Sequence, residues 1–304
     1  MQASAICRFM LCATLAVCCI ESVVAADSMT LRKIQASGII SLGYWEAEFP
    51  FSFVGPGQRP SGYTLDICER IVDAVKHKMG LPDLDRRYVL VTAPTRFPLV
   101  ESGAVDLECG VSTHTVERER RVAFTVTTFV AEGRLLSKRS APVLQLKDMR
   151  GKVITSSIGT TSLANLQRLS AAEDLNIAIV PAENTLNGFH LVVADRAAAF
   201  AMDDALLRAI LAAQPNPDDY VISDERLTVE PYAIMLTPGD PEFKRLADQV
   251  IIDLFKSGEM LRLYKKWFQS PVAPTGVNLS FPLYTSMKRL AADPTDSADP
   301  ARYP

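Results

Sequence analysis

Short apolar runs alternate with amphipathic segments along the first half of the chain. Residues 39–43 and 88–92 are apolar runs of strand length, and residues 64–79 place Ile67, Ile71 and Val75 on one helical face. Strands that alternate with helices of this length are typical of α/β units on a largely parallel sheet. The pattern therefore predicts an α/β lobe in this part of the chain.

The same alternation starts again in the second half and predicts a second α/β lobe. The expected strands are residues 152–156, 177–180 and 197–202, and the expected helices are residues 161–171 and 205–213. Two further extended segments, residues 126–136 and 229–236, are rich in β-branched and apolar residues and are candidates for paired hinge strands. We therefore expect a discontinuous first lobe (residues 30–132 plus 236–290) and a second lobe (residues 133–235).

Both ends of the chain differ in character from the two lobes. Arg8 is the only charge before the apolar run 9–20, and small residues precede Asp27. This arrangement indicates a signal peptide over residues 1–26, cleaved after Ala26, and an exported protein; an uncleaved anchor is the less favoured alternative. Residues 291–304 contain three prolines and little helical periodicity, and we expect them to form a disordered tail.

Composition narrows the classes of function. A net charge of −3 with mixed signs argues against nucleic acid as a partner. We interpret the basic run around Arg118 as a solvated helix face. The three histidines show no spacing typical of metal ligands, and no nucleophile elbow or phosphate-binding loop occurs. The sequence thus predicts no metal, no cofactor and no enzyme.

Two cysteines, Cys68 and Cys109, remain after removal of the signal peptide. In an oxidising compartment they can pair, or they can be two separate buried thiols. Cys68 falls on a predicted helix and Cys109 at a strand end, and the sequence does not give their separation. We favour separate thiols, because a free cysteine often packs in the core as a small apolar residue.

The segment DLECGVSTHTVERERRVAF (residues 106–124) is the most informative part of the chain, together with Arg96. A short strand ends at Gly110, the backbone turns through residues 111–113, and a charged run is expected to open a helix. Free N–H groups at such a turn bind anions. With the guanidinium of Arg96, they predict a site for a small carboxylate ligand.

At this point the chain resembles the periplasmic amino-acid-binding proteins of ABC importers, in particular their glutamate/aspartate-binding branch. The matching segments include LRKIQASGIISLG, GYTLDICERIVDAVKHKMG, TRFPLVESGAVDLECG, LKDMRGKVITSSIGTTS, RAAAFAMDDALL and DPEFKRLADQVIIDLFKSGEMLRLYKKWF, in family order. The resemblance implies a type II periplasmic binding protein, with two lobes, two hinge strands and ligand in the cleft. It also implies a monomer whose partners are an amino acid and an inner-membrane ABC permease.

The resemblance assigns a role to five positions. Arg96 and Thr113 would hold the ligand carboxylate from the first lobe, and Thr160 and Thr161 of the GTTS turn would add donors from the second. Asp203 would take the ammonium group, since it follows an apolar strand at its carboxyl end. Asp204 is expected to cap the next helix.

The side-chain end of the expected pocket departs from the family pattern. Trp45 stands where that branch typically has a basic residue, Val111 and Ala93 where it has hydroxyl side chains, and Thr185 where it has a histidine. An acidic ligand side chain buried without a partner would cost several kcal/mol. We therefore expect a neutral or partly apolar ligand, with an aromatic one that stacks on Trp45 as one candidate.

Two other functions use the same fold. Some exported dehydratases resemble it, and here His114, Asp203 and Glu46 are the candidate acids or bases, with His114 placed at the rim of the pocket. A sensor that docks on a membrane receptor would bind ligand in the same way. Amino-acid capture for an importer remains the leading hypothesis.

Overall fold

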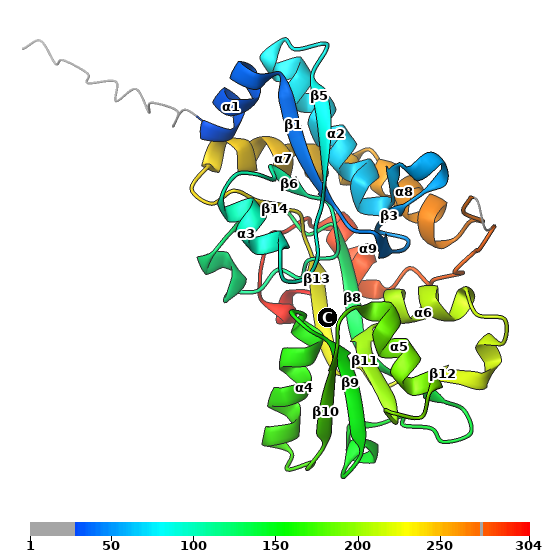
Figure 1. The fold of residues 1–304 in the computed structure, drawn as a ribbon. Coiled ribbons are helices and arrows are strands. Elements are labelled where there is room, and N and C mark those ends of the chain that lie inside the picture. Colours follow the sequence, from blue (N-terminus) through cyan, green and yellow to red (C-terminus); the bar gives the residue numbers. More distant parts are fainter. Residues whose placement is uncertain (1–27, 274–275) are drawn as a thin grey trace, which may run out of the picture.

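Residues 28–273 and 276–304 are described by the computed structural model, in which two α/β lobes are joined by a pair of strands (Figure 1). The expected signal peptide lies outside the described residues. None of the helices in the described ranges is long and apolar enough to cross a membrane.

The first lobe contains a five-stranded sheet in the order β5-β1-β6-β14-β7. Strand β1 (Ile39–Tyr44) pairs in parallel with β5 (Asp85–Leu90) and β6 (Leu107–Glu108), and β14 (Met235–Leu236) is antiparallel to β6 and to β7 (Ala123–Phe124). Because β14 comes from far along the chain, two separate segments build this sheet. The other elements of the lobe are α1 (Met29–Ser37), α2 (Tyr63–Met79), α3 (Arg96–Glu101), α7 (Pro241–Lys256), α8 (Glu259–Phe268) and the small sheet of β2 (Ala47–Glu48), β3 (Ser52–Val54) and β4 (Pro60–Ser61).

The second lobe repeats the alternation of strands and helices. Strand β9 (Val153–Ser157) is parallel to β10 (Ala178–Ala182) and β11 (Ala199–Asp203), and β8 (Phe129–Lys138) is antiparallel to β11 and β12 (Tyr220–Ile222). Its helices are α4 (Thr161–Ala172), α5 (Thr185–Val193) and α6 (Asp204–Ala212).

The two predicted hinge segments pair with each other. Strand β13 (Thr228–Tyr232) lies antiparallel to the first half of β8, from Thr228 opposite Gly133 to Tyr232 opposite Phe129. Both strands run between the lobes (Figure 1). The expected two-lobed fold with two connecting strands is confirmed.

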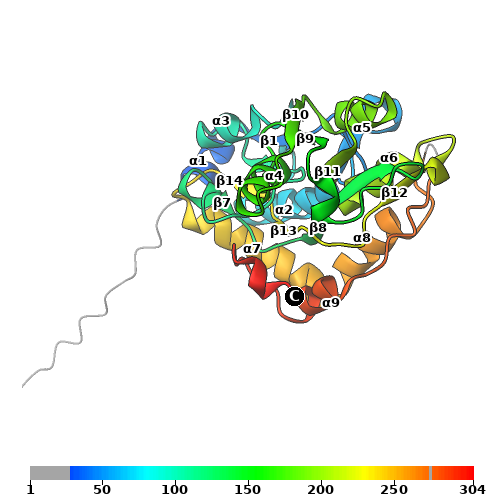
Figure 2. The same cartoon turned by 90° about the horizontal axis from the view of Figure 1, so that it is seen from below.

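The end of the chain differs from the prediction. Residues 291–304 do not form a disordered tail: after α9 (Thr285–Ala292) the chain lies beside the larger helices of the first lobe (Figure 2) and ends in a short turn, η5 (Pro300–Arg302). Tyr303 is only 1% exposed, and its hydroxyl lies 2.8 Å from that of Thr127. Proline content and weak periodicity do not reveal such a packed irregular segment.

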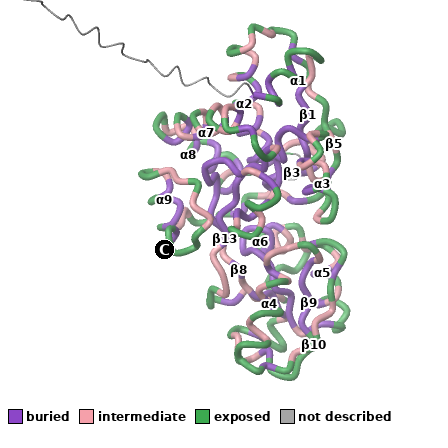
Figure 3. The backbone as a smooth tube through the Cα atoms, turned by 90° about the vertical axis from the view of Figure 1, so that its left-hand side faces the viewer, coloured by how far each residue is buried: buried purple, intermediate pink, exposed green. Residues whose placement is uncertain are grey.

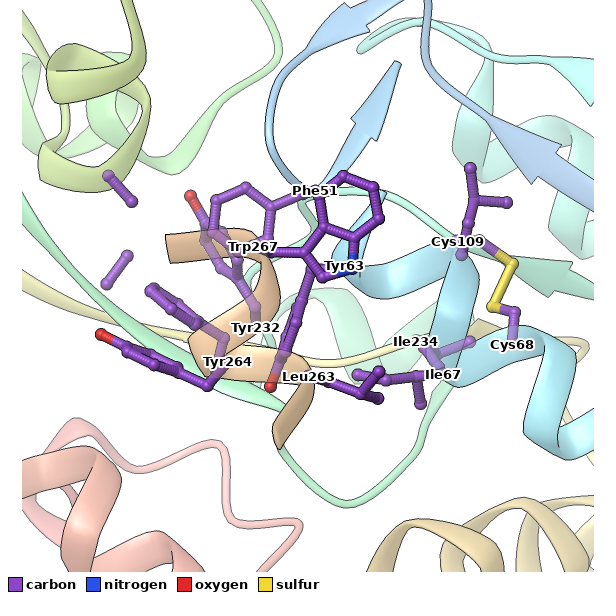
Figure 4. Close-up of a cluster of buried hydrophobic side chains, with 14 of the residues drawn as sticks. Phe51, Tyr63, Ile67, Cys68, Cys109, Tyr232, Ile234, Leu263, Tyr264 and Trp267 are labelled. Carbon is purple, nitrogen blue, oxygen red and sulfur yellow. A yellow bond between two sulfur atoms is a disulfide. The ribbon is translucent and has the colours of Figure 1, made fainter. Parts of the chain in front are cut away.

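Buried residues run through the middle of both lobes, while the outer turns are exposed (Figure 3). In the first lobe an aromatic cluster includes Phe51, Tyr63, Phe129 and Phe268, whose rings make mainly edge-on contacts. Figure 4 shows Phe51 and Tyr63 in this cluster beside Tyr232, Tyr264 and Trp267.

Cys68 and Cys109 form a disulfide, with a Cα–Cα distance of 6.2 Å (Figure 4). The interpretation as two separate thiols is therefore wrong. The bond links α2 to the end of β6, which lies directly before the expected carboxylate turn. The two cysteines are 41 positions apart in the sequence, and the sequence does not show that this distance is closed in the fold.

Candidate ligand-binding site

A cavity of about 650 Å³ lies between the lobes. Its walls are the segments that follow β1, β5 and β6 in the first lobe and β9, β10 and β11 in the second. Carboxyl ends of parallel strands are the usual ligand-binding edge of α/β sheets. Nine residues that were expected at the two ends of the ligand line this one cavity: Trp45, Ala93, Arg96, Val111, Thr113, Thr160, Thr161, Thr185 and Asp203.

Arg96 begins α3 and is 2% exposed. Its Nη2 donates to the carbonyl of Gly159 in the second lobe at 3.1 Å, while its Nε has no partner among the described residues. Burial, followed by the nearby charge of Arg118, lowers the pKa of Arg96 to about 10. The guanidinium remains charged at neutral pH and can donate to an anion in the cavity.

Arg118 adds a second guanidinium that the sequence analysis missed. The expected helix after Thr113 is instead a single turn, η2 (Arg118–Arg120), which turns the Arg118 side chain inward. Its Nη1 donates to the Thr113 carbonyl at 2.9 Å, and its Nη2 lies 3.4 Å from the Gly159 carbonyl. The interpretation of this residue as part of a solvated helix face is wrong.

Hydroxyl groups from both lobes meet near the two arginines. Thr113 Oγ1 lies 3.3 Å from Thr161 Oγ1, which donates to the buried Glu230 at 2.7 Å. Thr160 caps α4, since its Oγ1 accepts from the N–H of Leu163 at 3.2 Å. The GTTS turn thus places the start of α4 at the cavity, as expected for a turn that presents anion donors.

Asp203 ends β11 and is 3% exposed. It stands at the N-cap position of α6 without a capping hydrogen bond, and its carboxylate accepts instead from Ser162 and Tyr232. Burial and then the nearby Glu230 raise the pKa of Asp203 to about 8. A carboxylate in this environment gains from a cation that enters the cavity.

Asp204 does not cap α6 as expected. It is fully buried, and its Oδ1 accepts from the N–H groups of Glu132 on β8 and of Ala205. The contact with Glu132 fastens the start of α6 to the hinge strand.

Trp45 lies against the first-lobe end of the cavity. Its Nε1 donates to the buried Glu108 at 2.6 Å, and the guanidinium of Arg96 lies 5.2 Å from its ring centroid. Gly110 permits this packing, because a Cβ there would lie 2.1 Å from Trp45 Nε1. One role of Trp45 is therefore to support Arg96. The partly buried Val111 also lines the cavity.

Glu48 is a second residue that the sequence analysis missed. It is 6% exposed, and its Oε1 accepts from the hydroxyl of Thr185, the first residue of α5, at 2.9 Å. Its Oε2 has no partner among the described residues. Burial raises the pKa of Glu48 to about 7, against the opposing effects of Thr185 and Arg96.

Three buried polar atoms without partners in the described structure therefore belong to the lining of one cavity: Arg96 Nε, Glu48 Oε2 and Ser157 Oγ. Native proteins pair nearly all such atoms, so each is a place for a ligand group or water. The sequence pattern carries no signal that would single out Glu48, since one acid between apolar residues also suits a surface turn.

His114 lies outside this lining and is not a rim residue. It is 2% exposed, stacks on Phe124 with a centroid distance of 4.4 Å, and its Nε2 lies 2.8 Å from Glu119. Glu46 does line the cavity. No group of three or more His, Cys, Asp or Glu suited to a metal ion occurs in residues 28–273 and 276–304.

Relatives in sequence are binding proteins. An L-glutamate/L-aspartate-binding protein of Pseudomonas aeruginosa is 42% identical over 90% of this chain and 92% of its own length. A glutamate/aspartate import solute-binding protein of Escherichia coli is 37% identical over 90% of each chain. Neither is an enzyme, in agreement with the sequence-based expectation.

Solved structures agree with the fold. A mutant of ArgBP from T. maritima superposes with a TM-score of 0.69 at 26% identity, covering 79% of this chain and 99% of its own. An ancestral arginine-binding protein bound to arginine gives a TM-score of 0.67 at 24% identity, covering 76% of this chain and 98% of its own, and shows the fold alone.

A family model extends this agreement over most of the sequence. The model for bacterial extracellular solute-binding proteins, family 3, matches residues 40–270. That match includes every cavity residue described above and both lobes' sheets apart from Ile39, the first residue of β1. The chain therefore belongs to the bacterial extracellular solute-binding proteins of family 3.

Proposed function

We propose that this protein captures an α-amino acid between its lobes and delivers it to an inner-membrane ABC importer. The observation that carries the proposal is the presence of a buried arginine and a buried aspartate, Arg96 and Asp203, in the lining of one cavity. An amino acid is a zwitterion, so its carboxylate can pair with Arg96 and its ammonium group with Asp203. The relatives that bind glutamate and aspartate support this proposal.

Contacts between the lobes support capture by closure. The Arg96 to Gly159 and Thr113 to Thr161 contacts both join the first lobe to the second across the cavity. A ligand that bridges the same groups would favour the closed arrangement over an open one, and bending of β8 and β13 would exchange the two. We further propose that the protein acts as a periplasmic monomer after removal of residues 1–26.

Calorimetric titration of the mature protein with the twenty amino acids tests this function. At least one should bind with a Kd in the micromolar range or below, about −8 kcal/mol or stronger. Addition of the bound protein to its permease in vesicles should then raise the rate of ATP hydrolysis. A folded protein that binds none of the twenty amino acids would contradict the proposal.

The monomer proposal is tested separately by light scattering of the same sample. A measured mass above that of one chain would contradict it.

A further inference from the structure

The side chain of Glu48 is buried in the cavity wall. One of its carboxylate oxygens accepts a hydrogen bond, and the other has no partner among the described residues. Its Oε1 is held by Thr185 of the other lobe at 2.9 Å, which leaves Oε2 as an acceptor without a partner in the described residues. An unpaired buried acceptor costs free energy that a ligand donor would recover. Glu48 Oε2 is therefore a candidate acceptor for a donor group of the ligand.

Glu48 lies in the part of the wall where the ligand cavity adjoins a second hollow. Glu48 and Thr185 line the ligand cavity and also a second hollow of about 560 Å³, which is otherwise mostly apolar and lies toward α6. Their contact therefore forms part of the boundary between the two hollows. A ligand whose main-chain groups pair with Arg96 and Asp203 leaves its side chain as the part available to this wall.

The charged residues of the cavity lining favour one class of ligand side chain. Two arginines, Arg96 and Arg118, face a lining that contains four acids, Glu46, Glu48, Glu183 and Asp203. The ligand carboxylate would use the arginines, and the ligand ammonium would use Asp203. A second ligand carboxylate would then face Glu48 with no further basic side chain among the described residues of the lining, whereas a donor group would meet an acceptor.

We propose that Glu48, held by Thr185, recognises the side chain of the bound amino acid, and that this side chain ends in N–H donors rather than in a carboxylate. The inference rests on the proposed function and narrows its ligand to amide, ammonium or guanidinium side chains. Ser157 Oγ, the other unpartnered acceptor in the described part of the lining, remains available to the same ligand. Glutamate and aspartate, although bound by the relatives, fall outside the class.

Calorimetry with matched ligands tests the inference. Glutamine, asparagine, arginine and lysine carry N–H donors, glutamate and aspartate carry carboxylates, and norvaline carries neither. For the wild type, the best donor ligand should bind at least about tenfold tighter than glutamate and norvaline, a difference of about 1.4 kcal/mol. Glutamate or norvaline as the tightest ligand would overturn the inference and leave amino-acid capture intact.

The variant Glu48→Gln separates the two donor classes, because it keeps the shape and one acceptor but removes the charge. A cationic ligand should lose about a hundredfold in affinity and an amide ligand about tenfold or less, since charge-assisted hydrogen bonds are the stronger ones. Norvaline affinity should not change. Unchanged affinities of all donor ligands in Glu48→Gln would overturn the role of Glu48.

Two further variants keep the test interpretable. Thr185→Val removes the hydroxyl that holds Oε1 and should weaken donor ligands without changing norvaline. Glu173→Gln alters an exposed acid beyond the end of α4 and should match the wild type for every ligand. Thermal unfolding of each variant establishes that it is folded, and if no amino acid binds to the folded wild type, the proposed function fails together with this inference.

Discussion

Three side chains proposed to bind the ligand, Arg96, Asp203 and Glu48, are buried where their charged forms are disfavoured. Arg96 is buried beside Arg118, and the resulting fall in its pKa means that the protein disfavours its charged form relative to water. Asp203 and Glu48 show the opposite shift, with pKa values raised to about 8 and about 7 by burial. Such groups reduce stability in the empty protein, and ligand groups of opposite charge offset that cost.

Arg96→Met should therefore separate binding from stability. Methionine keeps much of the side-chain volume but removes the charge, so the free energy of unfolding should stay within about 1 kcal/mol of the wild type or rise. Amino-acid binding should weaken by about 2–4 kcal/mol, because a desolvated carboxylate loses its partner. Calorimetry and urea unfolding of the two proteins measure both quantities, and Arg118→Met provides the matched comparison. An unchanged Kd would remove Arg96 from the site.

Asp203→Asn should act on only one end of the ligand. It should weaken α-amino acids by at least about tenfold while it spares the hydroxy acids of the same side chain, since only the ammonium group needs a negative partner. Paired titrations of each amino acid and its hydroxy acid measure the difference. Equal losses for both classes would instead point to a structural role through Ser162 and Tyr232.

How much of the site could be predicted depended on the kind of residue. Thr160, Thr161 and Asp203 lie at strand or helix ends that the hydrophobic pattern reveals, and the family resemblance assigned Arg96. All four residues line the cavity. Arg118 and Glu48 could not be recognised, because a charged run and a lone acid in a turn usually face solvent. Only the way the chain turns after Thr113 and after β1 brings them inside.

At the scale of elements, much of the strand and helix pattern was predictable, but the single turn η2 in place of an expected helix and the links between elements were not. The expected helix 64–79 agrees with α2, and the expected pairing of the hinge segments agrees with β8 and β13. The disulfide could not be predicted, because it depends on the distance between α2 and the end of β6. That link supports the turn at Gly110, against which Trp45 packs.

Reduction of the Cys68–Cys109 bond should lower stability by about 2–4 kcal/mol, because the open form regains the chain entropy of a long loop on unfolding. Urea unfolding with and without reductant measures this change. The double variant Cys68→Ala/Cys109→Ala is the control, since it should unfold at the same urea concentration in both conditions. A wild type insensitive to complete reduction would contradict the prediction.

At the scale of the whole molecule, residues 285–304 contact the region where the two lobes join. The N–H of Thr127 donates to the Thr295 carbonyl at 2.9 Å, and the N–H of Val130 contacts the sulfur of Met287 at 3.2 Å. Lys244 of α7 pairs with Asp296 at 2.8 Å. These contacts join residues 285–304 to the start of β8 and to the first lobe, next to the strands expected to bend on ligand release.

Removal of residues 294–304 should therefore destabilise the protein. The deletion exposes the pocket of Tyr303 and leaves the Thr127 N–H without its carbonyl, and burial of one large side chain with a hydrogen bond corresponds to about 2–4 kcal/mol. Tyr303→Phe should cost about 1 kcal/mol, since only the hydroxyl contacts with Thr127 and Ser297 are lost. Removal of the exposed Pro304 alone is the matched control and should have no effect. Urea unfolding monitored by tryptophan fluorescence measures the stability of all three variants. Equal unfolding midpoints for the deletion variant and the wild type would show that the end of the chain is the frayed tail that its composition suggested.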